Sequence, residues 1–147
     1  LEKTNIIEAT QNSFDYLKTR SSRLIEFSID VPKGYIPVML NSQLYSWTIE
    51  NLVKNAIDAM RGKGKLHIQI KEEQKWAHIF IKDTGKGLDK NKFKLVFEPG
   101  HTTKKRGWGL GLSLAKRIIE GYHHGRIKVE ESEINKGTTF KISLRKV

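Results

Sequence analysis

Hydrophobic residues along this chain recur at two periods, which separate helices from strands. A return every three or four positions, without glycine or proline, predicts an amphipathic helix, whereas strict alternation predicts a half-buried strand. Glycine, proline and short polar runs mark the turns. In chain order these patterns predict a helix over residues 2–19, strands over 24–29 and 36–40, a helix over 41–60, strands over 65–71 and 76–82, a helix over 109–120, and strands over 125–130 and 138–144.

The ends of these elements carry local signals. Asn41 or Ser42 can cap the second helix, which stops at the glycine-rich residues 61–64, and Gly121 suits the end of the last helix. The order helix, strands, helix, hairpin, loop, helix and hairpin favours an α+β fold. We therefore expect one domain over residues 1–147, a two-layer α/β sandwich with helices on one face of a mixed, mostly antiparallel sheet.

Composition narrows the classes of protein to consider. The chain has no cysteine, which excludes disulfides and thiolate chemistry, and its apolar runs are far shorter than the ~20 residues that cross a bilayer. It begins at Leu1 inside a helical pattern, so we expect a cytoplasmic fragment of a longer protein, which is itself compatible with a membrane anchor. The net charge of +11 favours anionic partners, but no aromatic stacking platform or recognition motif points to nucleic acid.

A stripe of short polar residues interrupts the second helix. Asn51, Asn55 and Asp58 fall within about 60° of one another on a helix, and the apolar residues of the segment point the other way. Such side chains are costly in a helix interior because they compete for backbone hydrogen bonds. Their oxygens are hard ligands of the kind that Mg²⁺ takes together with phosphate groups. An ordinary solvated face is the alternative.

Three glycine-rich segments lie downstream of this stripe. Asp83 ends a strand just before Gly85 and Gly87, where glycine allows close approach to a flat ligand and the carboxylate can accept from an exocyclic amine; a tight turn is the alternative. Residues 107–112 open the last helix, where free N–H groups and the helix dipole favour an anion, although a hinge would use the same glycines. Residues 137–140 start the final strand.

A basic run stands immediately before the second glycine segment. Thr102, Thr103, Lys104, Lys105 and Arg106 place hydroxyls and cations where a lid could cover phosphates and neutralise charge during phosphoryl transfer. A solvated basic loop is the alternative.

Taken in order, these motifs resemble the catalytic ATP-binding domain of sensor histidine kinases, within the superfamily that also holds DNA gyrase, MutL and a heat-shock chaperone. The order is Asn-x3-Asn-x2-Asp on a helix, Asp-x-Gly-x-Gly, Phe-Glu-Pro with Thr-Thr-Lys, Gly-x-Gly-Leu-Gly-Leu, and Gly-Thr. It covers nearly the whole chain, and all five motifs in register are highly specific. The resemblance implies a Bergerat-type fold that binds ATP and Mg²⁺ and passes the γ-phosphoryl group to a protein histidine in two-component signalling.

The resemblance also implies a role for each matching position. Asn55 would be the principal Mg²⁺ ligand, assisted by Asn51. Asp83 would accept the adenine amino group. Lys104 and Arg106, in the lid, would join Asn55 as catalytic residues. The other residues implied at the nucleotide are Asp58, Gly85, Gly87, Leu88, Thr102, Thr103, Gly107, Trp108, Gly109, Leu110, Gly111, Leu112, and Thr138 or Thr139, with Phe93 and Phe97 matching the family's F box.

Some features depart from the family pattern. Asp58-Ala59 stands where many members carry Lys or His followed by an aromatic residue, and His101 stands in the lid where phenylalanine is frequent. None of the five histidines lies in the His-Glu or His-Asp motif with a following proline that holds the family's phosphate acceptor. We therefore expect this chain to act in trans on a helical dimerisation and acceptor domain of the same parent protein, and through it on a response regulator.

Two other readings of the same motifs stay open. One is an ATPase or protein-serine kinase regulator of the same fold. The other is a module that binds ATP only to regulate a partner, without catalysis.

Overall fold

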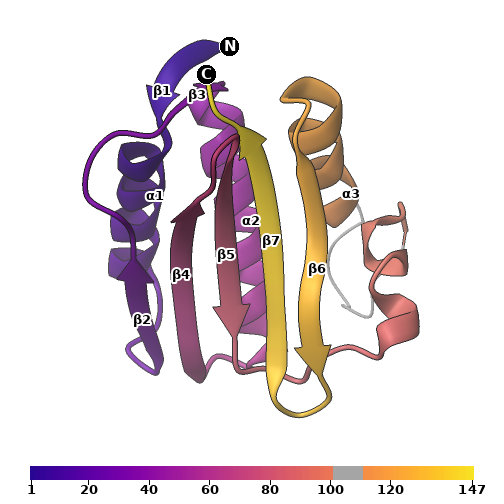
Figure 1. The fold of residues 1–147 in the computed structure, drawn as a ribbon. Coiled ribbons are helices and arrows are strands. Elements are labelled where there is room, and N and C mark those ends of the chain that lie inside the picture. Colours follow the sequence, from indigo (N-terminus) through magenta and orange to yellow (C-terminus); the bar gives the residue numbers. More distant parts are fainter. Residues whose placement is uncertain (101–110) are drawn as a thin grey trace.

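A computed structural model of the protein describes residues 1–100 and 111–147. Its centre is a five-stranded sheet in the order β2-β4-β5-β7-β6 (Figure 1). β2 runs parallel to β4, and the other neighbouring strands are antiparallel. The strands of this sheet are β2, Ile25–Asp30; β4, Gly64–Glu72; β5, Trp76–Asp83; β6, Arg126–Glu133; and β7, Gly137–Arg145.

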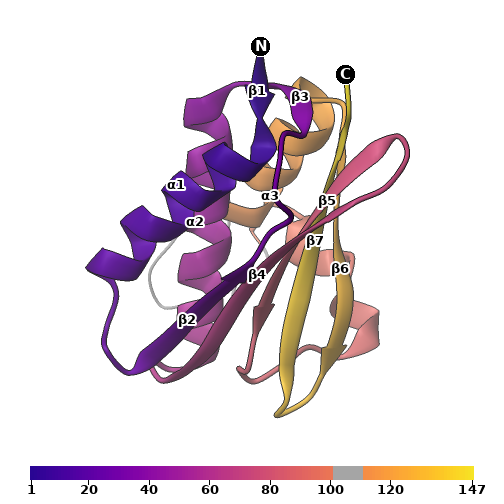
Figure 2. The same ribbon diagram turned by 60° about the vertical axis from the view of Figure 1, so that its left-hand side comes forward.

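The helices cover one face of the sheet, as Figure 2 shows from the side. The expected α+β two-layer sandwich with a mixed, mostly antiparallel sheet is therefore confirmed. In the described ranges, no helix is long and apolar enough to cross a membrane. The helices are α1, Ile6–Arg20; α2, Ser42–Ala59; and α3, Gly111–Lys116, which continues as a π-helical turn, Arg117–Tyr122, while short 3₁₀ turns lie at Lys90–Lys92 and Leu95–Phe97.

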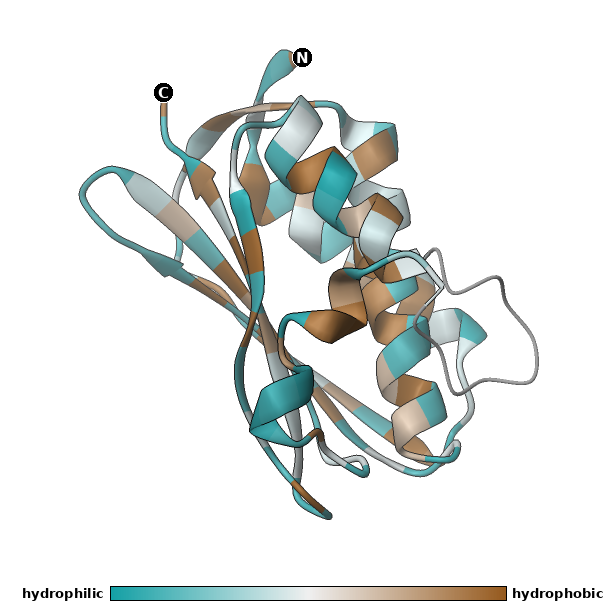
Figure 3. Ribbon diagram, turned by 90° about the vertical axis from the view of Figure 1, so that its right-hand side faces the viewer, coloured by the Kyte–Doolittle hydropathy of each residue, from teal (hydrophilic) through white to brown (hydrophobic). Residues whose placement is uncertain are grey.

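The hydrophobic core fills the space between the two layers. Alternation along the strands turns Leu66, Ile79 and Ile142 toward the helices, where each is fully buried. Ile49 and Leu52 of α2 meet them from the other side. In Figure 3 hydrophobic and hydrophilic stretches alternate along strands and helices alike, as expected of elements that each bury one face. The core fixes α2 against the sheet and so fixes where its polar stripe lies.

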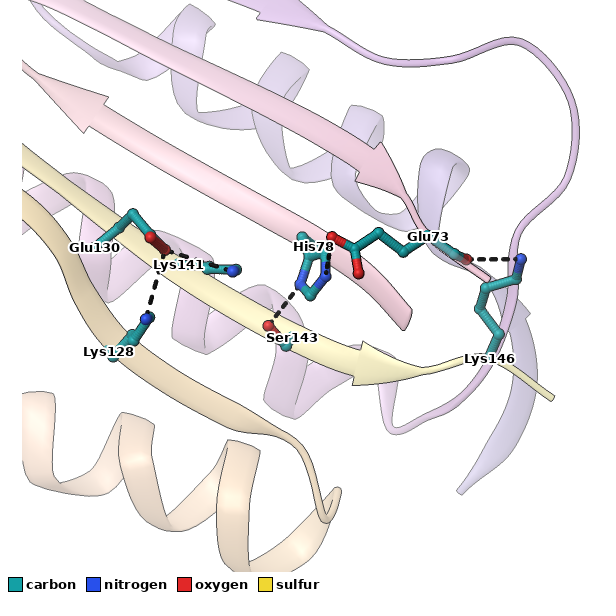
Figure 4. A network of polar contacts seen from close by, with 7 residues as sticks. All are labelled: Glu73, His78, Lys128, Glu130, Lys141, Ser143 and Lys146. Atoms are coloured by element: carbon teal, nitrogen blue, oxygen red, sulfur yellow. Dashed lines mark hydrogen bonds and ion pairs between the residues drawn. The ribbon is translucent and has the colours of Figure 1, made fainter. Parts of the chain in front are cut away.

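The opposite face of the sheet carries polar and charged side chains (Figure 4). His78 lies between the hydroxyl of Ser143, 2.7 Å from its Nδ1, and the carboxylate of Glu73, 3.3 Å from its Nε2. Nearby, Lys141 pairs with Glu130 at 3.5 Å. These contacts cross from strand to strand and tie the hairpins together on the solvent side.

The predicted start of the first helix is wrong. Residues Glu2–Asn5 form strand β1, which pairs antiparallel with β3, Pro37–Leu40, in a separate two-stranded sheet. The helix begins only after Asn5, whose side chain accepts a hydrogen bond from the N–H of Ile7. Pairing with a strand more than thirty residues away overrides the local helical pattern, because it satisfies the backbone groups of this segment equally well.

The predicted cap and end of the second helix are confirmed, whereas the predicted end of the last helix is wrong. Asn41 caps α2, its Oδ1 accepting from the N–H of Leu44 at 3.0 Å, and the helix ends before the turn at residues 61–64 as expected. Gly121, by contrast, lies inside the π-helical turn, and His124 takes the left-handed conformation that follows. The extra turn carries the chain beyond the predicted helix end.

Candidate functional site

The polar stripe of α2 lies at the edge of the core. Asn51 and Asn55 are partly buried and Asp58 is exposed, whereas Leu52 and Ala56 on the other side of the helix are buried. The residues that α2 needs for packing and those that it offers to a ligand are thus separated by the helical period. Helix α2 therefore presents the two amides at a depth where a ligand can be partly shielded from water.

Asn51 lies directly beneath the start of α3. A Cβ atom at Gly111 would lie 2.8 Å from both Nδ2 and Oδ1 of Asn51, so a larger residue there would push the amide of Asn51 aside. The Nδ2 atom of Asn51 is buried and has no hydrogen-bond partner among the residues that the structure describes. A buried amide donor without a partner costs about 1–3 kcal/mol, and a bound ligand with acceptor oxygens would remove that cost. Leu112, next to Gly111, is partly buried.

At the end of β5, Asp83 provides a buried carboxylate only 3% exposed to solvent. Its Oδ1 accepts from the N–H of Gly85 at 2.8 Å and from the N–H of Thr138 at 3.3 Å. Within residues 1–100 and 111–147, these two bonds are the polar contacts of the carboxylate, and Oδ2 accepts none. Burial raises the pKa of Asp83, and the two N–H groups partly offset that rise.

The loop that follows Asp83 is held against the end of α2. The N–H of Lys86 donates to the carbonyl oxygen of Ala59 at 3.0 Å. Gly85 lies so close to Ala59 that an added Cβ would meet its carbonyl carbon and oxygen at 2.7 Å. Gly87, with φ +75°, packs on the backbone of Glu133. The two glycines of the motif thus allow a close approach to the chain's own backbone on either side, rather than serving only as a turn.

The hairpin of β6 and β7 packs directly on this loop. The hydroxyl of Ser132 accepts from the N–H of Leu88 at 2.7 Å and donates to the carbonyl of Gly137 at 3.0 Å. It also lies 2.7 Å from the hydroxyl of Thr138. The sequence pattern did not single out Ser132, because a bulge between Val129 and Glu131 shifts the alternation of β6 and hides which face Ser132 occupies.

The other residues compared with the family pattern fall into three groups. Thr139 follows Thr138 on β7, so its side chain leaves on the other face of the sheet. Phe97 is buried with its ring edge-on to Phe140 at 6.0 Å, and Phe93 is partly buried. Those outside the described residues are His101, Thr102, Thr103, Lys104, Arg106, Gly107, Trp108, Gly109 and Leu110.

His123 joins the two helices that border the stripe. Its Nε2 accepts from the N–H of Asn41 at the start of α2 at 3.1 Å, and its Nδ1 donates to the carbonyl of Ile118 at 2.9 Å. Burial lowers the pKa of His123, which keeps the ring in the neutral form that both bonds require. Because α2 carries Asn51 and the segment before His123 carries Gly111, this link helps to hold the contact between them.

The arrangement has two chemically different ends. Around Asp83 and Thr138 the protein offers oxygen acceptors, suited to a ligand with an exocyclic amine. Along α2 it offers the side-chain amides of Asn51, which lies against the start of α3, and of Asn55, and their oxygens suit a hard cation that is bound together with phosphate groups. A ligand that carries both an amine-bearing base and phosphates would match both ends.

Comparisons with known proteins agree with this geometry. The sequence profile of the histidine kinase-, DNA gyrase B-, and HSP90-like ATPases matches residues 42–147. Sporulation kinase E of Bacillus subtilis (strain 168) is 34% identical over 145 residues, which make up 97% of this chain but 19% of that kinase. The chain thus spans about a fifth of the length of this relative.

Solved structures of histidine kinases match the fold of this chain. The catalytic domain of histidine kinase ThkA matches with a TM-score of 0.86 at 27% identity, over 99% of this chain and 99% of that one. ThkA has also been solved in complex with the response regulator protein TrrA; that kinase chain matches with a TM-score of 0.84 at 24% identity, over 99% of this chain and 42% of that one.

Proposed function

We propose that this chain, which belongs to the family of histidine kinase-, DNA gyrase B- and HSP90-like ATPases, binds ATP with Mg²⁺ and donates the γ-phosphoryl group to a histidine of a separate helical domain. The observation that carries the proposal is the buried carboxylate of Asp83. One of its oxygens is taken by two backbone N–H groups, and the other has no donor among the described residues. The amino group of adenine is such a donor.

In this proposal the adenine lies beside Asp83, where the loop after β5 and the start of β7 pack on each other. Asp83 accepts from the amino group, and Gly85, Gly87, Leu88 and Thr138 complete the surroundings of the base. The backbone bonds that hold Asp83 are already made without a ligand, so the protein has little left to order when the base binds.

The stripe of α2 would receive the phosphates and the metal. Asn55, assisted by Asn51, is the proposed Mg²⁺ ligand, and the unpartnered amide of Asn51 beneath Gly111 supports the fit. Bound Mg²⁺ supplies positive charge that offsets the charge on the phosphate oxygens. Asp58 lies further along the stripe at an exposed position and is the outermost member of the proposed set.

The rest of the proposal concerns catalysis and partners. Lys104 and Arg106, with Asn55, are the proposed catalytic residues, with Thr102, Thr103, Gly107, Trp108, Gly109, Leu110, Gly111 and Leu112 completing the nucleotide site. The acceptor histidine would belong to a helical dimerisation domain of the same parent protein, and a response regulator would receive the phosphoryl group next. ThkA, solved in complex with the response regulator protein TrrA, supports a response regulator as a partner. We propose a cytoplasmic location, where ATP is available.

The adenine contact can be tested with Asp83→Asn. Because Oδ1 already accepts from two N–H groups, the new amide oxygen is expected to keep that place and the NH₂ group to face the ligand. Two donors would then meet, and ATP affinity should fall by about tenfold or more in calorimetry. Asp30→Asn, which removes the same charge from an exposed position on β2, is the matched control and should bind like wild type. Equal affinities for both variants would contradict the assignment.

Metal dependence and transfer need separate measurements. Chelation with EDTA should weaken ATP binding, and unchanged affinity would contradict the metal assignment. Incubation with γ-labelled ATP and a helical dimerisation domain that carries the acceptor histidine should give acid-labile phosphohistidine. Acid-stable label would favour the serine kinase alternative, free phosphate alone would favour the ATPase, and binding without turnover would favour the regulatory module.

A further inference from the structure

The hydrogen bonds around Ser132 have a direction that the geometry determines. A serine hydroxyl has one hydrogen. The carbonyl of Gly137 can only accept, so the hydrogen of Ser132 lies on that 3.0 Å bond. The N–H of Leu88 can only donate, so Ser132 accepts there at 2.7 Å. The remaining 2.7 Å contact, to the hydroxyl of Thr138, must then take its hydrogen from Thr138.

We infer that Ser132 is a positioning residue that orients the hydroxyl of Thr138 and thereby sets which purine the site accepts. With its hydrogen committed to Ser132, the Thr138 oxygen can offer only lone pairs to a ligand. The backbone N–H of the same threonine donates to Asp83, so this oxygen lies beside a second group that can only accept in its ionised form. Both polar groups at this end of the site therefore favour a ligand that donates hydrogen bonds.

This inference rests on the proposed function, in which a purine occupies the space beside Asp83. A 6-amino purine brings two N–H hydrogens to these acceptors. A 6-oxo purine held in the same place brings a carbonyl oxygen, which meets two acceptors and forms no bond with either. A site discriminates strongly against a ligand that leaves buried polar groups of the protein without hydrogen bonds, because the protein as well as the ligand then loses its bonds. Ser132 would act on this selectivity without touching the base.

The burial of the group supports a fixed orientation. Thr138 is 6% exposed and Asp83 is 3% exposed, so water cannot freely replace either partner. Ser132 reaches three groups on two segments: the N–H of Leu88 in the loop after β5, and the carbonyl of Gly137 and the hydroxyl of Thr138 at the start of β7. Removing its hydroxyl would release the Thr138 hydrogen, which could then rotate toward a ligand carbonyl.

The test compares the affinities of the chain for ATP and for inosine triphosphate, whose base carries a carbonyl in place of the amino group. Wild type should prefer ATP. In Ser132→Ala the ratio of the affinity for ATP to the affinity for inosine triphosphate should fall by about three- to tenfold, because the freed Thr138 hydroxyl can donate to the carbonyl. Ser143→Ala is the matched control: it removes a buried hydroxyl from β7 that contacts His78 on the opposite face, and should keep the wild-type preference.

A double variant distinguishes an effect on purine selectivity from a general loss of structure at the site. Thr138→Val keeps the shape of the side chain without the hydroxyl and should by itself narrow the preference, and adding Ser132→Ala to it should change the preference no further. Equal weakening of both nucleotides by Ser132→Ala, or a wild-type preference in Thr138→Val, would overturn the inference. Ser132→Thr, which retains the hydroxyl, should restore selectivity. A wild-type chain that binds neither nucleotide would overturn the proposed function instead.

Discussion

Gly85→Ala is the most direct probe of how the site is built, because it adds a single carbon atom at the closest contact between the loop after β5 and helix α2. The new Cβ would lie 2.7 Å from the carbonyl carbon and oxygen of Ala59 and 2.8 Å from its Cβ. The first two atoms belong to the backbone at the end of a packed helix and cannot move aside as a flexible side chain can. The loop itself must therefore shift.

The size of the effect follows from two contributions. Forcing one carbon into a packed contact costs about 1–3 kcal/mol. Moving the loop also lengthens the 3.0 Å bond from the Lys86 N–H to the Ala59 carbonyl, worth about 0.5–1.5 kcal/mol. We expect the free energy of unfolding to fall by about 2–4 kcal/mol, which for a chain of this size lowers the melting temperature by roughly 5–15 °C. ATP affinity should fall as well, because Gly85 also holds Asp83.

Urea denaturation followed by circular dichroism measures the stability change, and calorimetry measures the affinity. Gly121→Ala is the control, since the nearest atom to its added Cβ is 3.8 Å away and its backbone is helical. The same chemical change there should leave stability unchanged or raise it by up to about 1 kcal/mol. If Gly85→Ala proved as stable as wild type and bound ATP normally, the close contact with α2 would not exist as described.

Two further predictions concern the stripe and the histidine link. Asn51→Leu should raise the melting temperature of the nucleotide-free protein, because it removes a buried donor that costs about 1–3 kcal/mol when it has no partner. The same variant should weaken Mg-ATP binding. A lower melting temperature would show that the amide is satisfied in the free protein. Since burial lowers the pKa of His123 below its ordinary value of 6.5, the unfolded chain binds protons more readily, so stability is fully present above that pH and declines as pH falls below it. Urea midpoints measured from pH 7.5 to pH 5 should show this decline, and His123→Gln should flatten it; an unchanged slope in the variant would contradict the role of His123.

Much of the fold follows from local patterns. The helical period over residues 41–60 placed the hydrophobic side of α2 against the sheet and Asn51, Asn55 and Asp58 away from it, since side-chain direction along a helix is a property of the sequence spacing. The alternation in β4, β5 and β7 identified the hairpins in the same way. The order of the polar and glycine motifs along these elements then identified the family.

Other features depend on contacts between distant segments. Residues 2–5 look helical on their own but pair with β3, and the parallel pairing of β2 with β4 has no local signal at all. Ser132 was hidden by a bulge that moved it to the face of Thr138. The glycine pattern at Gly85 indicated close approach, but only the structure showed that the close neighbour is Ala59.

The difference between what the sequence determined and what the tertiary structure decided has a physical reason. Periodicity, capping and turn chemistry are set by residues a few positions apart, so the sequence by itself determined most of the elements and the polar stripe, and it placed Asp83 at the end of β5. Hydrogen-bond direction and steric limits at the site arise where loop, helix end and hairpin meet, and these segments are separated by dozens of residues. Only the tertiary structure could decide that Ala59 limits Gly85, that His123 ties the two helices, and that Ser132 orients Thr138.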